Sequence, residues 1–186
     1  MKILVMLSGG LDSAVVLAEL KAQKHECVAI GFDYGQRHVI ELEYAHRIAA
    51  QFGVPFRRLK IAPAIPLVDE VVFAARNLIL AAHAIAHAQA THFDAIAVGC
   101  NSTDWDRFRD CRPPFWKAVE TAAEAYGIKV LTPLLHSYKA EIMAHARKLD
   151  LPTTWSCYAP TADSRVCGQC LACVVNREAE QCLTDA

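Results

Sequence analysis

The first residues whose types and spacing suggest chemistry are Ser8-Gly9-Gly10-Leu11-Asp12-Ser13, directly after the apolar run at residues 3–7. A buried strand that ends in Ser-Gly-Gly and leads into a helix presents free backbone N–H groups at the positive end of the helix dipole, where phosphate binds. The segment has no Gly-Lys-Ser/Thr ending, so it is not a Walker loop. We expect a phosphate cradle, and a tight turn capped by Asp12 is the alternative.

Four cysteines form a second group: Cys157, Cys167, Cys170 and Cys173. Two residues between thiolates allow one tight turn to aim consecutive sulfurs at a single tetrahedral Zn²⁺, and the more distant Cys157 completes the set. A redox Cys-x2-Cys pair and an iron–sulfur cluster are the competing interpretations. We expect a structural zinc site with four protein ligands and no open position for chemistry.

The strands and helices that would position these groups alternate along the chain. Apolar or β-branched runs predict strands at residues 3–7, 27–32, 56–61, 94–99 and 128–131. Amphipathic stretches predict helices at residues 12–23, 39–52, 71–90, 114–126 and 138–149. Strict alternation favours right-handed crossovers and a parallel sheet covered on both faces. The expected fold is α/β, with a doubly wound, mainly parallel five-stranded sheet.

The alternation stops after Leu149, where a segment with Pro and Cys begins. We expect an α/β domain over residues 1–150 and a zinc-binding appendage over residues 151–186 that packs on it. Ligands of a parallel sheet gather outside the carboxyl ends of its strands. The site is therefore expected in the loops at residues 8–12, 33–38, 100–112 and 132–139.

Composition and charge narrow the class of partner. Of the 186 residues, 54% are hydrophobic, an excess that a buried oligomer interface would explain. A net charge of -1 provides no positive field for nucleic acid, so a small-molecule substrate is favoured. The N-terminal apolar stretch is expected to be a strand rather than a signal peptide. Polar residues interrupt the longest apolar stretch, so we expect no membrane span and a cytoplasmic protein.

The phosphate segment resembles the PP-loop of the ATP pyrophosphatase superfamily. Members of that superfamily hold the pyrophosphate of ATP while a substrate oxygen attacks the α-phosphate. The resemblance implies adenylation with release of AMP and pyrophosphate, rather than transfer of the γ-phosphate.

Further blocks make the resemblance more specific. They are Phe32-Asp33-Tyr34-Gly35-Gln36-Arg37-His38, Asp110-Cys111-Arg112-Pro113 and the four cysteines. With the phosphate segment they resemble the 7-cyano-7-deazaguanine synthase family over the whole chain. That family converts 7-carboxy-7-deazaguanine into the nitrile with ammonia and two ATP, through an acyl adenylate, an amide and an adenylated amide. The resemblance implies ATP, Mg²⁺ and Zn²⁺ as cofactors and a homodimer.

Two segments depart from the family pattern. Phe73-Ala74-Ala75-Arg76-Asn77 stands where Val-Pro-x-Arg-Asn is usual, and the loop before it is short. Asp106-Arg107-Phe108-Arg109 replaces a usual Ser-Gly-Tyr-Pro. Both lie in what the resemblance implies is the substrate wall, so the departures concern substrate identity more than ATP chemistry.

The resemblance also implies roles around the nucleotide. Asp12 is expected to hold Mg²⁺ or to cap its helix. Lys139 matches a family lysine that reaches the phosphate, with a solvated surface lysine as the alternative. Arg37 is expected to face phosphate. The residues expected to bind the cofactor directly are Ser8, Gly9, Gly10, Leu11, Asp12 and Ser13.

A second set of residues is expected to bind the substrate. Arg76 and Asn77 lie on an otherwise apolar helix, which favours a pocket role over a salt bridge to a neighbouring helix. Asp104 and Asp110 can accept the N–H groups of a guanine-like edge. Arg112 can hold the substrate carboxylate or a phosphate, or lie at the rim.

Two histidines and three aromatic residues could have functional roles, but a structural role is at least as well supported for each. His83 and His87 share a helix face as in a zinc protease helix, but Ala84 stands where the catalytic Glu would be. Trp105, Trp116 and Phe115 can stack on a deazapurine or belong to the core.

The sequence therefore predicts an ATP-dependent carbon–nitrogen ligase that adenylates 7-carboxy-7-deazaguanine and uses ammonia. No glutaminase domain is evident, so ammonia would arrive free or from another protein. One alternative is an enzyme that stops at the amide or joins another amine. A second alternative is a PP-loop sulfurtransferase that adenylates a tRNA base. Such an enzyme would need a tRNA-binding domain and a basic face, and neither is evident in the sequence. A non-catalytic, zinc-stabilised nucleotide-binding module is the remaining alternative.

Overall fold

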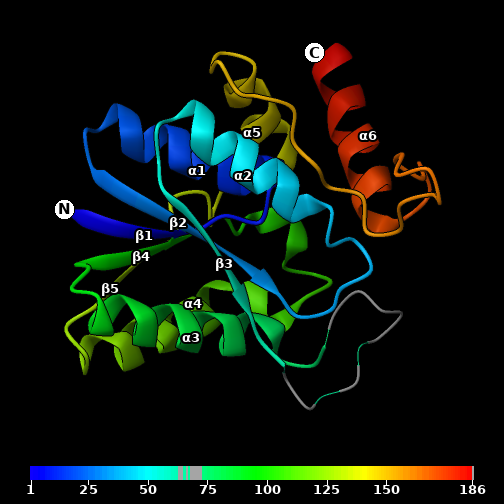
Figure 1. Cartoon of the computed structure of the whole chain (residues 1–186). Coiled ribbons are helices and arrows are strands. Elements are labelled where there is room, and N and C mark those ends of the chain that lie inside the picture. Colours follow the sequence, from blue (N-terminus) through cyan, green and yellow to red (C-terminus); the bar gives the residue numbers. More distant parts are fainter. Residues whose placement is uncertain (63–64, 66, 68–72, 186) are drawn as a thin grey trace.

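Five parallel strands form the central sheet of the computed structural model, which describes residues 1–62, 65, 67 and 73–185. The strands lie in the order β3-β2-β1-β4-β5, and every neighbouring pair is parallel (Figure 1). Their bounds are β1 (Lys2–Met6), β2 (Glu26–Asp33), β3 (Phe56–Lys60), β4 (Ala95–Val98) and β5 (Lys129–Leu131). The order reverses direction at β1, which creates a crevice between the ends of β1 and β4. The expected α/β fold is confirmed.

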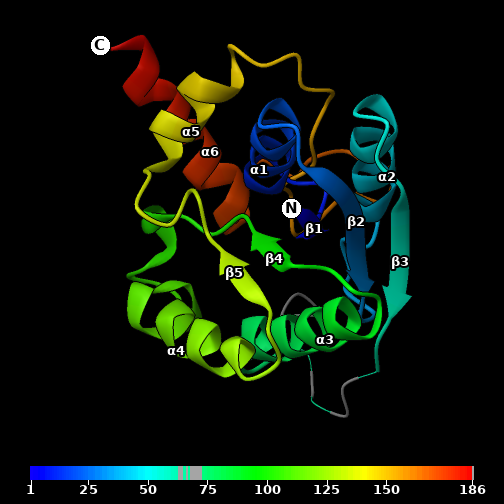
Figure 2. The same ribbon diagram turned by 90° about the vertical axis from the view of Figure 1, so that its left-hand side faces the viewer.

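Helices cover both faces of the sheet (Figure 2). One face carries α1 (Leu11–Ala22), α2 (Glu41–Gln51) and α5 (Lys139–Ala146). The other face carries α3 (Arg76–Ala90) and α4 (Pro113–Glu124). This two-sided covering is the doubly wound arrangement that strict strand–helix alternation predicts.

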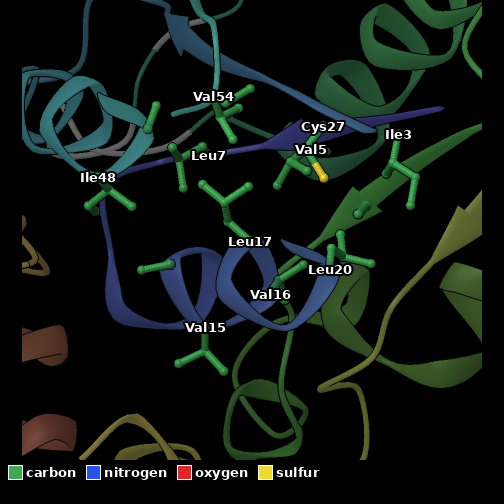
Figure 3. Packing of buried hydrophobic residues seen from close by; sticks show 14 of the residues in the cluster. Ile3, Val5, Leu7, Val15, Val16, Leu17, Leu20, Cys27, Ile48 and Val54 are labelled. Atoms are coloured by element: carbon green, nitrogen blue, oxygen red, sulfur yellow. The ribbon is translucent and has the colours of Figure 1, made fainter. Parts of the chain in front are cut away.

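The alternating side chains of β1 link the two core layers. Ile3 and Val5 pack in the layer with α1, α2 and α5, where Figure 3 shows Leu17 between helix and strand. Leu4 points to the opposite face and packs with Ile96 and the residues of α3 and α4. Because successive strand side chains point to opposite faces, a sheet buried on both sides requires an unbroken apolar run, which residues 3–6 of β1 supply. The buried central strand β1 leads directly into the phosphate loop.

Element boundaries differ from expectation at α3. The helix expected from residue 71 begins at Arg76, and residues 71 and 72 lie outside the described residues. Ala75, just before it, has φ 55°, a left-handed conformation that a helix interior does not contain. The sequence pattern missed this start because apolar residues continue before it without a break.

A helix that the sequence analysis did not predict closes the chain. It is α6 (Leu171–Thr184), and its N-cap is Cys170. The sequence analysis interpreted this segment only through its cysteine spacing. The residues Leu-Ala-Cys-Val-Val at 171–175 also begin an amphipathic helix, which that interpretation missed. The helix packs along α5, and Arg147 pairs with Glu180 across the contact. No helix in the described part of the chain combines the length and hydropathy that a membrane span needs.

Candidate active site

Contacts within the protein hold the phosphate loop in shape. Gly9 has φ +91°, and a Cβ on it would lie 2.0 Å from the backbone oxygen of Glu41, so only glycine fits. Ser13 Oγ donates to the Gly10 carbonyl at 3.0 Å and accepts from the Ser8 N–H at 3.3 Å. The backbone N–H groups of residues 11–13 donate to no described residue. Three N–H donors at the start of α1 are therefore available to an anion.

An ion pair closes the far side of this loop. Nζ of Lys139 donates to Oδ1 of Asp12 at 2.7 Å, and Lys139 is only 8% exposed, so it is not a solvated surface lysine. Its backbone N–H donates to Thr103 Oγ1 at 2.9 Å, which ties the start of α5 to the loop after β4. The structure thus brings both expected catalytic side chains to the phosphate loop.

Asn101, which the sequence analysis missed, links the acidic residues of the site. Its amide nitrogen donates to Asp12 Oδ2 at 2.9 Å and lies 3.3 Å from Asp104 Oδ2. Burial, and then the charge of Asp12, raise the pKa of Asp104. The available signal was an amide two residues after the strand expected at residues 94–99, at the carboxyl edge of the sheet.

Arg76 and Asn77 begin α3 beside this group. Nη1 of Arg76 donates to the Tyr34 hydroxyl at 3.3 Å, and Arg76 lines both cavities described below. The Asn77 N–H donates to Asp110 Oδ2 at 3.2 Å, and its side-chain amide donates to the Asp110 carbonyl at 3.1 Å. Asp110 therefore caps the N-terminus of α3 from outside the helix.

Three residues expected to bind ligands lie elsewhere. Arg112 is exposed and its Nε donates to the Trp105 carbonyl at 2.6 Å. Arg37 is exposed as well. Neither of them, nor Asp110, lines either of the two cavities that adjoin the phosphate loop. Their roles in binding stay predictions.

Two cavities of about 180 Å³ each open at the carboxyl ends of β1, β2 and β4. The first adjoins Asp12, Asn101, Asp104 and Lys139, and Trp116 forms part of its wall. The second has mainly apolar walls from β1, β2, α2 and α3. The cavities share a boundary that consists of Ser8, Ser13, Glu41, Arg76, Asn77, Val98, Gly99 and Tyr158.

A buried polar cluster lies on this boundary, and the sequence analysis overlooked it. Gln36 Nε2 donates to the Phe32 carbonyl at 2.9 Å and to Glu41 Oε1 at 3.1 Å. His38 Nε2 lies 3.5 Å from the same carboxylate oxygen. Burial raises the pKa of Glu41 to about 7 and lowers the pKa of His38 to about 4. The available signal was the spacing Gln36-x-His38-x-x-Glu41 after a strand, in a segment from which only Arg37 was expected to reach the ligand.

The four cysteines meet as their spacing predicts. Their sulfur atoms lie within 4.8 Å of one another, with 3.5 Å from Cys170 to Cys173 and 3.9 Å from Cys170 to Cys157. A tetrahedral site with Zn–S bonds of about 2.3 Å has sulfur separations of about 3.8 Å, so the group fits zinc. N–H donors from Gln169 and Cys170 lower the pKa of Cys167 to about 6, which favours the thiolate that a metal needs.

Among the described residues this is the one cluster in which three or more His, Cys, Asp or Glu side chains could share a metal ion, and it includes neither His83 nor His87. Cys170 and Cys173 sit at the start of α6, and the next residues of that helix, Val175 and Asn176, line the first cavity. The cysteine site thus positions part of the cavity wall as well as the C-terminal segment. The sequence analysis expected only the second role.

The strand order and the N–H cradle after β1 define a PP-loop nucleotide-binding α/β protein. The U34-tRNA thiolase NcsA from Methanococcus maripaludis shares the fold, with TM-score 0.59 and 16% identity over 100% of this chain and 73% of that one. NH3-dependent NAD synthetase from Campylobacter jejuni gives TM-score 0.54 and 20% identity over 81% of this chain and 64% of that one. These identities establish the fold alone.

Sequence comparison identifies the family. The family model "Queuosine biosynthesis protein QueC" matches residues 2–67 and 64–183. The 7-cyano-7-deazaguanine synthase of Leptospira interrogans is 34% identical over 210 residues, which span 97% of this chain and 86% of that protein. The synthase of Thiobacillus denitrificans is 36% identical over 204 residues, 94% of this chain and 91% of that protein. The chain belongs to the QueC family, as its motifs predicted, and the synthase names of its relatives support an enzyme.

Proposed function

We propose that the protein adenylates the carboxylate of 7-carboxy-7-deazaguanine and joins it to ammonia, giving the amide and then 7-cyano-7-deazaguanine. The observation that carries the proposal is the meeting of the free N–H groups of residues 11–13 with the Asp12–Lys139 pair at the edge of a cavity. A cradle for phosphate, a cation and a carboxylate beside a substrate-sized space are the parts that adenylation needs.

The phosphates of ATP would lie on the N–H groups at the start of α1. Lys139 offsets the negative charge that grows on departing pyrophosphate. Asp12, whose Oδ2 accepts a hydrogen bond from the Asn101 amide, is suited to hold Mg²⁺. When bound, Mg²⁺ would supply further charge neutralisation at the phosphates. The apolar walls of the second cavity suit the flat base of ATP.

The first cavity is the proposed place for the deazapurine. Its polar side chains include Arg76, which can pair with the substrate carboxylate, and Asp104, which can accept N–H groups from the guanine-like edge. Trp116 and Trp155 provide aromatic surface. We further propose that Asp110 and Arg112 act on this substrate through the loop after β4 rather than by lining the cavity.

Zinc at the four cysteines is part of the proposal. The site has no open coordination position, so the metal would hold α6 rather than take part in the reaction. We also propose a homodimer in the cytoplasm. An apolar groove of about 480 Å³ between α3 and α4 supports the dimer, since Leu78 and Tyr126 on it are 50% and 56% exposed.

Pyrophosphate release tests the proposed function. Purified protein with ATP, Mg²⁺ and 7-carboxy-7-deazaguanine should catalyse exchange of labelled pyrophosphate into ATP without ammonium, because adenylation precedes amide formation. A tRNA in place of the deazapurine should give no exchange. Exchange with tRNA alone would support the sulfurtransferase alternative, and no exchange with any carboxylate would support the non-catalytic module.

A further inference from the structure

Glu41 is the acidic residue that borders both cavities, and no step above uses it. It occupies the first position of α2, and its side chain is 13% exposed. Its backbone oxygen lies where a Cβ on Gly9 would be, so the phosphate loop packs directly on this turn. Glu41 therefore adjoins the proposed phosphate cradle without belonging to it.

The carboxylate of Glu41 is only partly engaged by the protein. Gln36 donates to Oε1 at 3.1 Å, and Nε2 of His38 lies 3.5 Å from the same atom. Within the described residues, Oε2 accepts no hydrogen bond. Because Glu41 borders both cavities, this oxygen is open to a ligand that brings N–H or O–H groups.

His38 offers a second acceptor in the same place. It is 1% exposed, lines the second cavity, and its Nδ1 finds no hydrogen-bond partner among the described residues. Burial, and then the charge of Arg76, lower the pKa of His38 to about 4, so the imidazole is neutral. In the tautomer that carries its proton on Nδ1, Nε2 offers a lone pair beside Glu41 Oε1, 3.5 Å away, so one ion can donate to both atoms.

We propose that Glu41 and His38 bind the ammonium ion that supplies the nitrogen, and that Glu41 removes one of its protons. The inference rests on the proposed function. An ammonium ion carries four N–H donors and one positive charge, which match a carboxylate and a neutral acceptor. The place on the boundary of the two cavities lets the ion lie beside both nucleotide and substrate.

The charges around Glu41 suit a proton acceptor. His38 faces it from the preceding turn, Tyr34 from the loop after β2, Arg76 from α3 and Tyr158 from the C-terminal segment. Burial raises the pKa of Glu41 to about 7, against smaller opposite effects of Gln36 and Arg76, and a base in this range accepts protons efficiently at neutral pH.

Proton transfer from ammonium to Glu41 precedes attack on the acyl adenylate. One N–H bond of ammonium breaks and its proton moves to Glu41, which leaves ammonia with a lone pair. That pair forms the C–N bond to the acyl adenylate, while the C–O bond to AMP breaks and its electrons pass to the phosphate oxygen. The surplus proton on nitrogen and the proton on Glu41 then pass to AMP or to solvent.

Glu41→Gln tests the role of the base in the full-length protein. Ammonium-dependent amide formation should fall by about a hundredfold or more. Exchange of pyrophosphate into ATP should stay within about threefold of the wild type. Hydroxylamine is unprotonated at neutral pH and needs no base, so hydroxamate formation should also be retained. Glu43→Gln on the same helix, at a side chain that is 63% exposed, is the matched control and should leave all three rates unchanged.

Two results would overturn the inference. The first is a Glu41→Gln variant that forms the amide at the wild-type rate and with the wild-type KM for ammonium. The other is equal loss of exchange, hydroxamate and amide in a folded Glu41→Gln protein, which would make the residue structural or nucleotide-binding. If the Glu41→Gln variant does not fold, the His38→Asn variant provides the test. Its KM for ammonium should rise about tenfold, which corresponds to the loss of one hydrogen bond. A rise in KM for ATP alone would refute the ammonium site. Failure of the proposed function is distinct, because the wild type itself would then show no exchange.

Discussion

Nζ of Lys139 and Oδ1 of Asp12 lie 2.7 Å apart although 127 residues separate them in the chain. Asp12 starts α1, which follows β1, and Lys139 starts α5, which follows β5. Both helices cover the same face of the sheet, so their N-terminal turns meet at its carboxyl edge. The Lys139 and Asp12 side chains are only 10% and 17% exposed, and a largely buried pair is sensitive to removal of one partner.

Asp12→Asn should keep the fold and lower pyrophosphate release by about a hundredfold or more, because the lost carboxylate charge acts at the phosphates. The amide can still accept from Asn101, so the circular dichroism spectrum should match the wild type. Glu120→Gln, at an exposed pair on α4, is the control. Wild-type turnover in Asp12→Asn would remove this carboxylate from the mechanism.

Cys170→Ser should reduce bound zinc and lower the melting temperature, since structural zinc contributes on the order of 10 kcal/mol of apparent binding energy in small modules. Because the start of α6 lines the first cavity, KM for the deazapurine should rise as well. Metal analysis and calorimetry measure the first effect and steady-state kinetics the second. Cys182→Ser, at an exposed cysteine on the same helix, should change none of these. Protein without zinc, or an unchanged melting temperature, would contradict the assignment.

Gly9→Ala should destabilise the protein by about 2 kcal/mol or more and abolish ATP binding. The new Cβ would meet the Glu41 carbonyl oxygen at 2.0 Å, and the positive φ adds strain. Gly35→Ala is the matched control, because Gly35 also has a positive φ but no atom within 4 Å of its Cβ position. We expect the control to cost about 1 kcal/mol. Urea denaturation and nucleotide titration measure both; equal effects of the two variants would show that the close approach to Glu41 is unimportant.

Asp110→Ala should cost about 1 kcal/mol of stability, because Asp110 caps α3 through the N–H of Asn77. If the cap is its main role, kcat and KM for the deazapurine should change together and modestly, as the start of α3 loosens around Arg76. Direct binding to the substrate edge would instead raise KM for the deazapurine with little loss of stability. Thermal unfolding and kinetics on one preparation separate these outcomes.

The final product tests the departures from the family pattern. Nitrile formation requires the amide to stay bound for a second adenylation, which depends on a wall that holds it in register. We expect mass spectrometry of a reaction with ATP, Mg²⁺ and ammonium to detect the amide first and the nitrile afterwards. Accumulation of the amide without the nitrile would support 7-carboxy-7-deazaguanine as the substrate and would refute the nitrile as the end product. Absence of both, with fold and zinc verified, would point to another carboxylate or amine.

The features that the sequence predicted well depend on local spacing. A strand, a Ser-Gly-Gly turn and a helix start are set by neighbouring residues, so the strand–turn–helix geometry around residues 8–13 was predictable from that segment alone. The same holds for the cysteines, because two intervening residues bring consecutive sulfurs together in one turn. Strict alternation of strands and helices limits the topology to few choices, which is why the sheet was predicted correctly.

Tertiary structure alone decided which distant residues meet. Asp12 joins Lys139 and Asn101, Asp110 turns to cap α3 instead of facing the cavities, and Glu41 becomes buried on their shared boundary. The spacing of apolar residues along the chain shows which face of a helix or strand is apolar. It does not show how the helices pack across the sheet, and this packing determines which polar side chains meet and which become buried. Burial then shifts the pKa of Glu41 toward neutrality, a property that no local pattern contains.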